Sequence, residues 1–264
     1  MPIVKAKNPV DAYRAWASAS DVSELSGRAH RSYLTEFVSE RILAAVKMRE
    51  EASLLDVGCG DGTLLIMARR SGARGRLAGV LPSPEEVDRV RHRLDSEHPG
   101  CSIAVTQGLA DALPVPDGSV DCLVCNGVLH IVGSDDESVG KAIAEIARVT
   151  VAGGAIYIGE VPDRDEFAGE DYGSSLLDYL RGVYRHQGFG HLLKALRKLM
   201  ASVLGSRPFV YGVYSCYFSP PETFTKLLER YGIQVESHAR HQVLKRKGRV
   251  VDSPSRWNYL CRKV

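Results

Sequence analysis

Short apolar runs alternate with amphipathic segments along the middle of the chain. The runs are nearly all apolar, which is typical of strands whose two sheet faces are both covered by helices. The segments between them repeat apolar residues every three or four positions, as helices do. The predicted strands are "SLLDV" (53–57), "GRLAGV" (75–80), "CSIAVTQG" (101–108), "VDCLVCNGV" (120–128) and "AGGAIYIGEV" (152–161). The predicted helices between them are "TLLIMARRSG" (63–72), "SPEEVDRVRHRLDSEH" (83–98) and "DESVGKAIAEIARVT" (136–150).

This alternation predicts parallel β-α-β units, because each helix carries the chain back to the start of the next strand. Local signals agree with the helix limits. Ser83 is a good N-cap, Pro84 suits the first helical position, and Gly72 suits a helix C-terminus. We therefore expect residues 50–160 to form an open, doubly wound α/β domain.

The flanking segments have other patterns. Residues 8–49 predict two helical pieces, and the segment after the α/β region is rich in tyrosine and glycine with one amphipathic helix. The last part predicts a helix and two antiparallel strands. The expected division is an N-terminal helical cap at 1–49, a core of 50–160 and 220–264, and an inserted lid at 161–219.

Composition and charge narrow the class of protein. The 264 residues are 44% hydrophobic and 25% charged, which is ordinary for a globular chain, and a net charge of +2 gives no sign of a nucleic-acid partner. No apolar run is long enough to span a membrane, and the N-terminus lacks a secretory signal pattern. Cys122 and Cys125 lie within a predicted strand without a second ligand pair, so we expect reduced thiols and no metal. A cytoplasmic protein is expected.

A glycine-rich turn, "LLDVGCGDG" (54–62), stands between the first predicted strand and its helix. Its glycines let the backbone turn sharply and approach a ligand closely. Asp56, at the end of the strand, favours a cationic or hydroxyl-bearing ligand over a bare pyrophosphate. The alternative interpretation, a tight turn with no ligand, stays open.

At this point the chain resembles the class I S-adenosylmethionine-dependent methyltransferases, particularly their small-molecule type 11 branch. The resemblance covers residues 30–160. The matching segments are "LLDVGCGDGTLL", "GVLPSPEEV", "QGLADALPVPDGSVDCLVCNGVLHIV" and "IARVTVAGGAIYIGEV". The resemblance implies a seven-stranded Rossmann-like sheet whose last strand is antiparallel, with an inserted helical lid and S-adenosylmethionine as the cofactor.

The resemblance also implies where that cofactor binds. Asp56 and the glycine loop would hold the methionine end. The expected cofactor-binding residues are Asp56, Gly58, Cys59, Gly60, Gly62, Leu81, Leu109, Ala110 and Asn126.

Two of those positions depart from the family pattern. Leu81 stands where the family has an acid that binds the ribose hydroxyls, and Leu109 stands where it has an Asp that contacts adenine. Losing both polar anchors weakens binding by about two to four orders of magnitude unless something compensates. Candidate replacements are Glu85 or Glu86 for the first and Asp111 for the second. The alternative is that the leucines close an empty slot.

Candidate catalytic and substrate residues follow the later strands. His130, just after the fourth strand, is the expected general base, because imidazole exchanges a proton near neutral pH. A structural histidine is the alternative. Glu160 ends the fifth strand. In the lid, hydroxyl and imidazole groups suit an amphipathic acceptor. The expected substrate residues are Glu160, Tyr172, His186 and His191.

The amphipathic helix of the lid, residues 191–204, carries leucines together with Lys194, Arg197 and Lys198. Packing on the core or in a homodimer interface is the favoured interpretation, and peripheral contact with a membrane surface or a lipid-linked substrate is the alternative.

We expect an S-adenosylmethionine-dependent methyltransferase that acts on a small-molecule or glycan-like acceptor, at oxygen. Two alternatives remain open. One is a catalytically degenerate relative that binds a partner or another ligand. The other is an enzyme that uses the same fold for a different reaction.

Overall fold

The computed structural model describes residues 3–6, 15, 25, 28, 31–163, 175–205, 209–211, 216–245 and 248–264. Its central sheet is made of β2 (Leu54–Val57), β3 (Leu77–Leu81), β4 (Ile103–Gln107), β5 (Val120–Asn126), β6 (Thr150–Pro162), β8 (Ile233–Leu244) and β9 (Val250–Lys263). The strands lie in the order β4-β3-β2-β5-β6-β9-β8. The pairs from β4 to β6 are parallel, and β9 runs antiparallel to both of its neighbours. The predicted seven-stranded sheet with an antiparallel last strand is confirmed.

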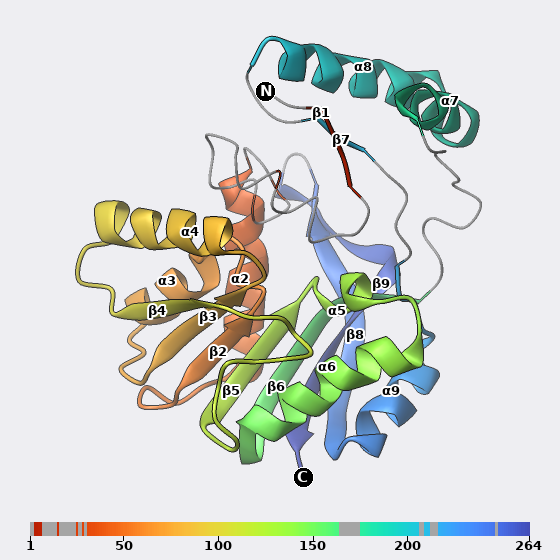
Figure 1. The fold of residues 1–264 in the computed structure, drawn as a ribbon. Coiled ribbons are helices and arrows are strands. Elements are labelled where there is room, and N and C mark those ends of the chain that lie inside the picture. Colours follow the sequence, from red (N-terminus) through yellow and green to blue (C-terminus); the bar gives the residue numbers. More distant parts are fainter. Residues whose placement is uncertain are drawn as a thin grey trace.

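Helices cover both faces of this sheet (Figure 1). One apolar core lies under α2 (Ser32–Val46), α3 (Thr63–Arg70) and α4 (Pro84–Glu97). The other lies under α5 (Leu129–Val132), α6 (Asp136–Val149) and α9 (Pro221–Arg230). All four side chains of β2 are buried, which explains why this strand is an unbroken apolar run except for its aspartate.

The N-terminus of α4 forms as its sequence predicts. Ser83 has extended backbone angles, and its side chain accepts a hydrogen bond from the Glu86 backbone N–H. Pro84 occupies the first helical position. The same arrangement begins α6, where Asp135 accepts from the backbone N–H of Ser138 at 2.8 Å. These caps fix where each helix begins relative to the strand before it.

A second unit lies apart from the central sheet in Figure 1, toward the edge where α5 follows β5. It contains α7 (Leu176–Gln187), α8 (Phe189–Val203), and a two-stranded parallel sheet of β1 (Ile3–Lys5) and β7 (Phe209–Tyr211). The ring of Tyr179 on α7 packs against Phe209 at 5.9 Å between centroids. The backbone N–H of Phe209 donates to the Ser202 hydroxyl of α8 at 3.1 Å.

This unit differs from the sequence prediction in two ways. The sequence predicted one helix here, and the structure has two. In α7, Gly182 and several aromatic residues give a weak intrinsic helix signal. The pairing of β1 with β7 joins distant three-residue segments, which no local pattern announces. The apolar residues of α8 lie on one side of the helix, as the sequence predicted, in two adjacent stripes of which only one is packed. Most of the predicted helical piece before residue 31 lies outside the described residues.

The core around α9 gives a stability test. Phe224 is fully buried, with ring centroids 4.9 Å from Tyr259 and 6.2 Å from Tyr217. We expect Phe224→Ala to lower the free energy of unfolding by about 3–5 kcal/mol, because it removes buried area and leaves a cavity. Urea unfolding followed by circular dichroism measures this. The matched control is Phe218→Ala, at a residue that is 44% exposed, which should change stability less than Phe224→Ala does. Equal losses in both variants would contradict the assignment of the core.

Candidate functional site

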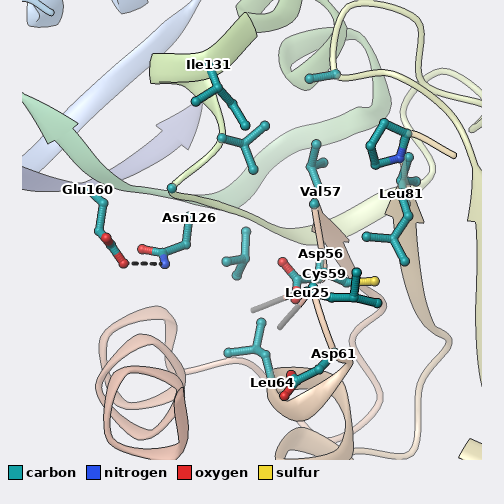
Figure 2. Close-up of a pocket in the computed structure, with 18 of the residues that line it drawn as sticks. Leu25, Asp56, Val57, Cys59, Asp61, Leu64, Leu81, Asn126, Ile131 and Glu160 are labelled. Carbon is teal, nitrogen blue, oxygen red and sulfur yellow. Dashed lines mark hydrogen bonds between the residues drawn. The ribbon is translucent and has the colours of Figure 1, made fainter. Parts of the chain in front are cut away.

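A cavity of about 470 Å³ lies at the carboxyl ends of β2, β3, β5 and β6 (Figure 2). Ligands of doubly wound sheets bind at this edge, where the loops that follow the strands converge. Helix α2 contributes a further wall through Thr35, Val38, Ser39 and Ile42. The predicted site residues that line the cavity are Asp56, Gly58, Cys59, Gly60, Leu81, Leu109, Ala110, Asn126, His130 and Glu160. Gly62 does not line it and instead caps α3.

The turn after β2 is fixed by close backbone contacts. Gly58 has a φ of +73°, and a Cβ added there would lie 2.4 Å from the Cγ2 of Val128. The backbone N–H groups of Gly58 and Cys59 both donate to the Val80 carbonyl, at 2.9 and 3.3 Å. The turn therefore needs glycine on both conformational and steric grounds. These two amides are already bonded within the protein, so they are not available to a ligand.

Asp56, near the end of β2, has a buried carboxylate and lines the cavity. Among the described residues no hydrogen bond or ion pair reaches it. Burial and the nearby charge of Asp61 raise the pKa of Asp56 to about 7. Asp61, in contrast, pairs with Arg93 of α4 at 3.2 Å. The unbalanced negative charge at Asp56 makes this end of the cavity complementary to a cation.

The two leucines that replace family acids lie in different surroundings. The Leu81 side chain is buried and belongs to the core under α2, α3 and α4. Leu109 is 46% exposed and lies in a short bridge with Ala112. Leu81 therefore fills space as a core residue, whereas Leu109 stands at the rim of the cavity.

Two of the three candidate replacement acids also line the cavity. Glu86 is buried in the first turn of α4, one turn beyond Leu81, and Asp111 is exposed two residues after Leu109. Glu85 is exposed and is not among the lining residues. The Ser83 hydroxyl donates to Oε2 of Glu86 at 2.7 Å, which fixes the carboxylate against the start of the helix.

The opposite wall is organised around Glu160, at the end of β6. Figure 2 shows its carboxylate meeting the side-chain amide of Asn126, which donates to Oε1 at 3.0 Å. Arg28 forms an ion pair with the same carboxylate, and Arg256 approaches Oε2 at 3.4 Å. The Nε2 atom of His241 lies 3.9 Å from Oε1.

These partners determine the charge of Glu160. Burial alone would raise its pKa, but Arg28, His241, Arg256 and the Asn126 amide together lower it to about 2. The carboxylate is therefore ionised at any physiological pH and is a weak base. Its backbone adopts a left-handed φ of 60°, which costs a non-glycine residue about 1–3 kcal/mol and is held by the surrounding contacts.

His130 reaches the cavity from the single turn α5, directly after β5. Its backbone carbonyl accepts a hydrogen bond from the Tyr217 N–H at 2.9 Å, which anchors this turn to the segment before α9. The imidazole and Asn126 thus belong to the same strand-end segment and face one cavity.

The predicted lid residues are placed elsewhere or are not described. His191 is exposed on α8 and is not among the lining residues. Tyr172 and the side chain of His186 lie outside the described residues. In the part of 161–219 that the structure describes, no residue lines the cavity. The assignment of Tyr172, His186 and His191 to a substrate site stays a prediction.

Sequence reasoning missed Arg28 and Arg256. They lie 132 and 96 positions from Glu160 along the chain, and each is a lone arginine outside any motif. No local sequence signal could have found them, because Arg256 meets Glu160 through the pairing of β9 with β6, and Arg28 meets it from a segment that is distant along the chain.

Residues 55–158 match the methyltransferase domain family. A curated relative, described as an uncharacterised 37.1 kDa protein in a transposon of Streptomyces fradiae, is 32% identical over 184 residues, which are 64% of this chain and 50% of that protein. The chain spans about half the length of the curated relatives that it matches over most of its own length.

Solved structures share the fold over almost the whole chain. The [4+2]-cyclase SpnF has a TM-score of 0.63 at 15% identity and covers 99% of this chain and 98% of its own. A putative methyltransferase solved in complex with the Trm112 methyltransferase activator of Haloferax volcanii has a TM-score of 0.61 at 16% identity, with 96% of each chain covered. The family match, the sheet order and the glycine turn agree, so residues 55–158 are similar to the methyltransferase domain family, and the chain as a whole shares the fold of these solved structures.

Proposed function

We propose that the protein transfers the methyl group of S-adenosylmethionine to a hydroxyl of a small-molecule or glycan-like acceptor. The observation that supports this most is the composition of the cavity. One end has the glycine turn and the buried Asp56, and the other has Asn126, His130 and Glu160. A cofactor and an acceptor held at these two ends would meet inside one cavity, which would bring the methyl group and the attacking hydroxyl together.

The residues present fit the cofactor. When bound, it supplies an electrophilic methyl group on a positively charged sulfur. A cavity of about 470 Å³ is within the usual range for small-ligand sites. Asp56 has no partner among the described residues, so a cationic ligand would give its buried carboxylate the counter-charge that it lacks. The ammonium and sulfonium groups of the cofactor carry the positive charge that would balance Asp56.

Glu86 is our candidate for the missing ribose acceptor. Its carboxylate lines the cavity one turn beyond Leu81 and is oriented by the Ser83 hydroxyl. A carboxylate held in this way can accept hydrogen bonds from a diol, as the family acid at position 81 does. Asp111 is placed to substitute for the acid missing at position 109, from an exposed position at the rim.

At the acceptor end, His130 would take the proton from the attacking hydroxyl. Glu160 is too weak a base for this role, because its pKa is held near 2. Instead, Glu160 orients the Asn126 amide through the 3.0 Å hydrogen bond, and Asn126 in turn borders the space beside His130.

A second candidate function is a reaction other than methyl transfer. It is favoured by the structural similarity to a [4+2]-cyclase and by the two leucines that replace polar anchors. Measuring cofactor binding together with methyl transfer distinguishes a methyltransferase from an enzyme of another reaction. Binding of the cofactor without transfer to any hydroxyl acceptor would favour this second function.

Cofactor binding tests the proposal directly. We expect S-adenosylmethionine to bind at micromolar concentrations in isothermal titration calorimetry. A bound cation favours the ionised form of Asp56, so affinity should rise with pH and level off above about pH 7. Asp56→Asn should weaken binding by about tenfold or more and flatten this pH dependence. Absence of binding at millimolar concentration would overturn the proposal.

The Asp56→Asn variant should also make the unliganded protein more stable, although it weakens cofactor binding. The folded-state pKa of Asp56 is raised, so the wild type loses stability as pH rises from about 4 to about 7. At pH 8, Asp56→Asn should therefore unfold at a higher urea concentration than the wild type. Asp95→Asn, which changes an exposed carboxylate, is the matched control. It should change neither the cofactor affinity nor the urea concentration at which the protein unfolds.

The role of Glu86 is tested by neighbouring substitutions. Glu86→Gln should weaken cofactor binding by about tenfold, because it removes a charged hydrogen-bond acceptor. Glu85→Gln should leave affinity unchanged, since Glu85 is exposed outside the cavity. Calorimetry measures both. If Glu86 only caps α4, Glu86→Gln will change stability and leave affinity as in the wild type.

His130 is tested through turnover. We expect His130→Gln to lower kcat by about 10²–10⁴-fold, because the hydroxyl loses its proton acceptor, while cofactor affinity stays close to that of the wild type. The assay follows transfer of a radiolabelled methyl group to a hydroxyl acceptor found by screening. His92→Gln, on the exposed face of α4, is the control. An unchanged kcat in His130→Gln would show that this histidine is structural.

A further inference from the structure

Helix α8 has two apolar stripes, and only one of them is packed. Ala195 and Ser202 are buried, and Leu192 and Leu199 beside them are half-buried, so this face contacts the rest of its unit. The second stripe is exposed, with exposed fractions from 37% to 70%. Its members, spaced four, three, four and three residues apart, are Phe189, Leu193, Leu196, Met200 and Val203.

Exposed apolar residues are concentrated in this unit. Isolated exposed apolar residues are common on protein surfaces, but a continuous set marks an interaction site. Leu177 and Tyr184, seven residues apart, are exposed on α7, and Leu204 is exposed directly after the end of α8. Together with the α8 stripe, these eight residues are more than half of the large exposed hydrophobic residues described in the chain. We call this set the α7–α8 apolar surface.

The charge of the same segment is strongly positive. Residues 175–205 contain one acidic residue, Asp178, against five basic ones. The whole chain has 34 basic and 32 acidic residues, so the remainder carries more acidic than basic residues. Arg197 lies one helical turn from both Leu193 and Met200 and so borders the apolar stripe directly. The five basic residues are Arg181, Arg185, Lys194, Arg197 and Lys198.

We propose that the α7–α8 apolar surface binds the surface of an anionic lipid bilayer. An apolar stripe bordered by Lys and Arg is the arrangement with which interfacial helices lie in the plane of a membrane. The apolar side chains would enter the acyl boundary, and the basic ones would contact the headgroups. Among the described residues no helix is long and apolar enough to cross a membrane, so the contact would be peripheral.

Charge argues against a second copy of this chain as the occupant. Two copies packed through the stripe would bring together two described segments, 175–205, that each carry five basic residues and one acidic residue, Asp178, so like charges would outnumber opposite ones. A bilayer with anionic headgroups supplies both the apolar interior and the opposite charge that this surface lacks. The proposal does not depend on the proposed methyl transfer, because lipid binding is measured without cofactor or acceptor.

The test is flotation of the 264-residue protein with vesicles. We expect the wild type to float with vesicles of phosphatidylcholine and phosphatidylglycerol at low salt, and to bind much less at high salt or to phosphatidylcholine alone. Replacing Phe189, Met200 and Val203 by serine should lower the vesicle partition coefficient at least roughly tenfold, because apolar contact area is lost. Replacing Lys194, Arg197 and Lys198 by glutamate should do the same for the anionic vesicles only.

The matched control is Tyr33→Ser with Phe218→Ser, which removes exposed aromatic residues outside this surface and should leave the partition coefficient unchanged. All substituted side chains are exposed, and circular dichroism checks that each variant folds. Failure of the wild type to bind anionic vesicles at low salt would overturn the proposal. So would equal binding by the serine variant, or light scattering that shows a dimer which this variant dissociates.

Discussion

The close approach of three strand ends at Gly58 is the constraint on which the site depends. The Val80 carbonyl at the end of β3 accepts from the Gly58 and Cys59 amides, and Val128 after β5 packs against the Gly58 Cα. Any side chain at position 58 would push these loops apart. Because the cavity is bounded by the same loops, its shape is set by backbone contacts that a ligand does not need to induce.

Two buried carboxylates face this cavity in opposite electrostatic states. The pKa of Asp56 is raised to about 7 by burial without a cation, whereas that of Glu160 is lowered to about 2 by two arginines, a histidine and an amide. In the part of the chain that the structure describes, cationic side chains neutralise Glu160, whereas no cation pairs with Asp56. The two ends of the cavity therefore differ in charge, and the end at the glycine turn favours a positively charged group of a ligand.

The sequence predicted the parts of the fold that local patterns determine. Apolar runs located the strands, Ser83 and Pro84 located the start of α4, and the glycine turn located the carboxyl edge where the cavity lies. It could not predict the pairing of Ile3–Lys5 with Phe209–Tyr211, because such contacts depend on how distant segments meet. The contacts of Arg28 and Arg256 with Glu160 could not be predicted for the same reason. Glu86 was one of three candidate acids, and burial distinguishes it from Glu85.

The wall around Glu160 extends beyond the matched domain, although most of the residues that line the cavity lie within it. The Glu160 carboxylate contacts Arg28 before α2, Asn126 at the end of β5 and Arg256 on β9. The family match covers only residues 55–158. A fragment cut at those limits would keep the glycine turn and discard the salt-bridge frame that faces it. The cavity therefore depends on segments that lie on both sides of the matched domain along the chain.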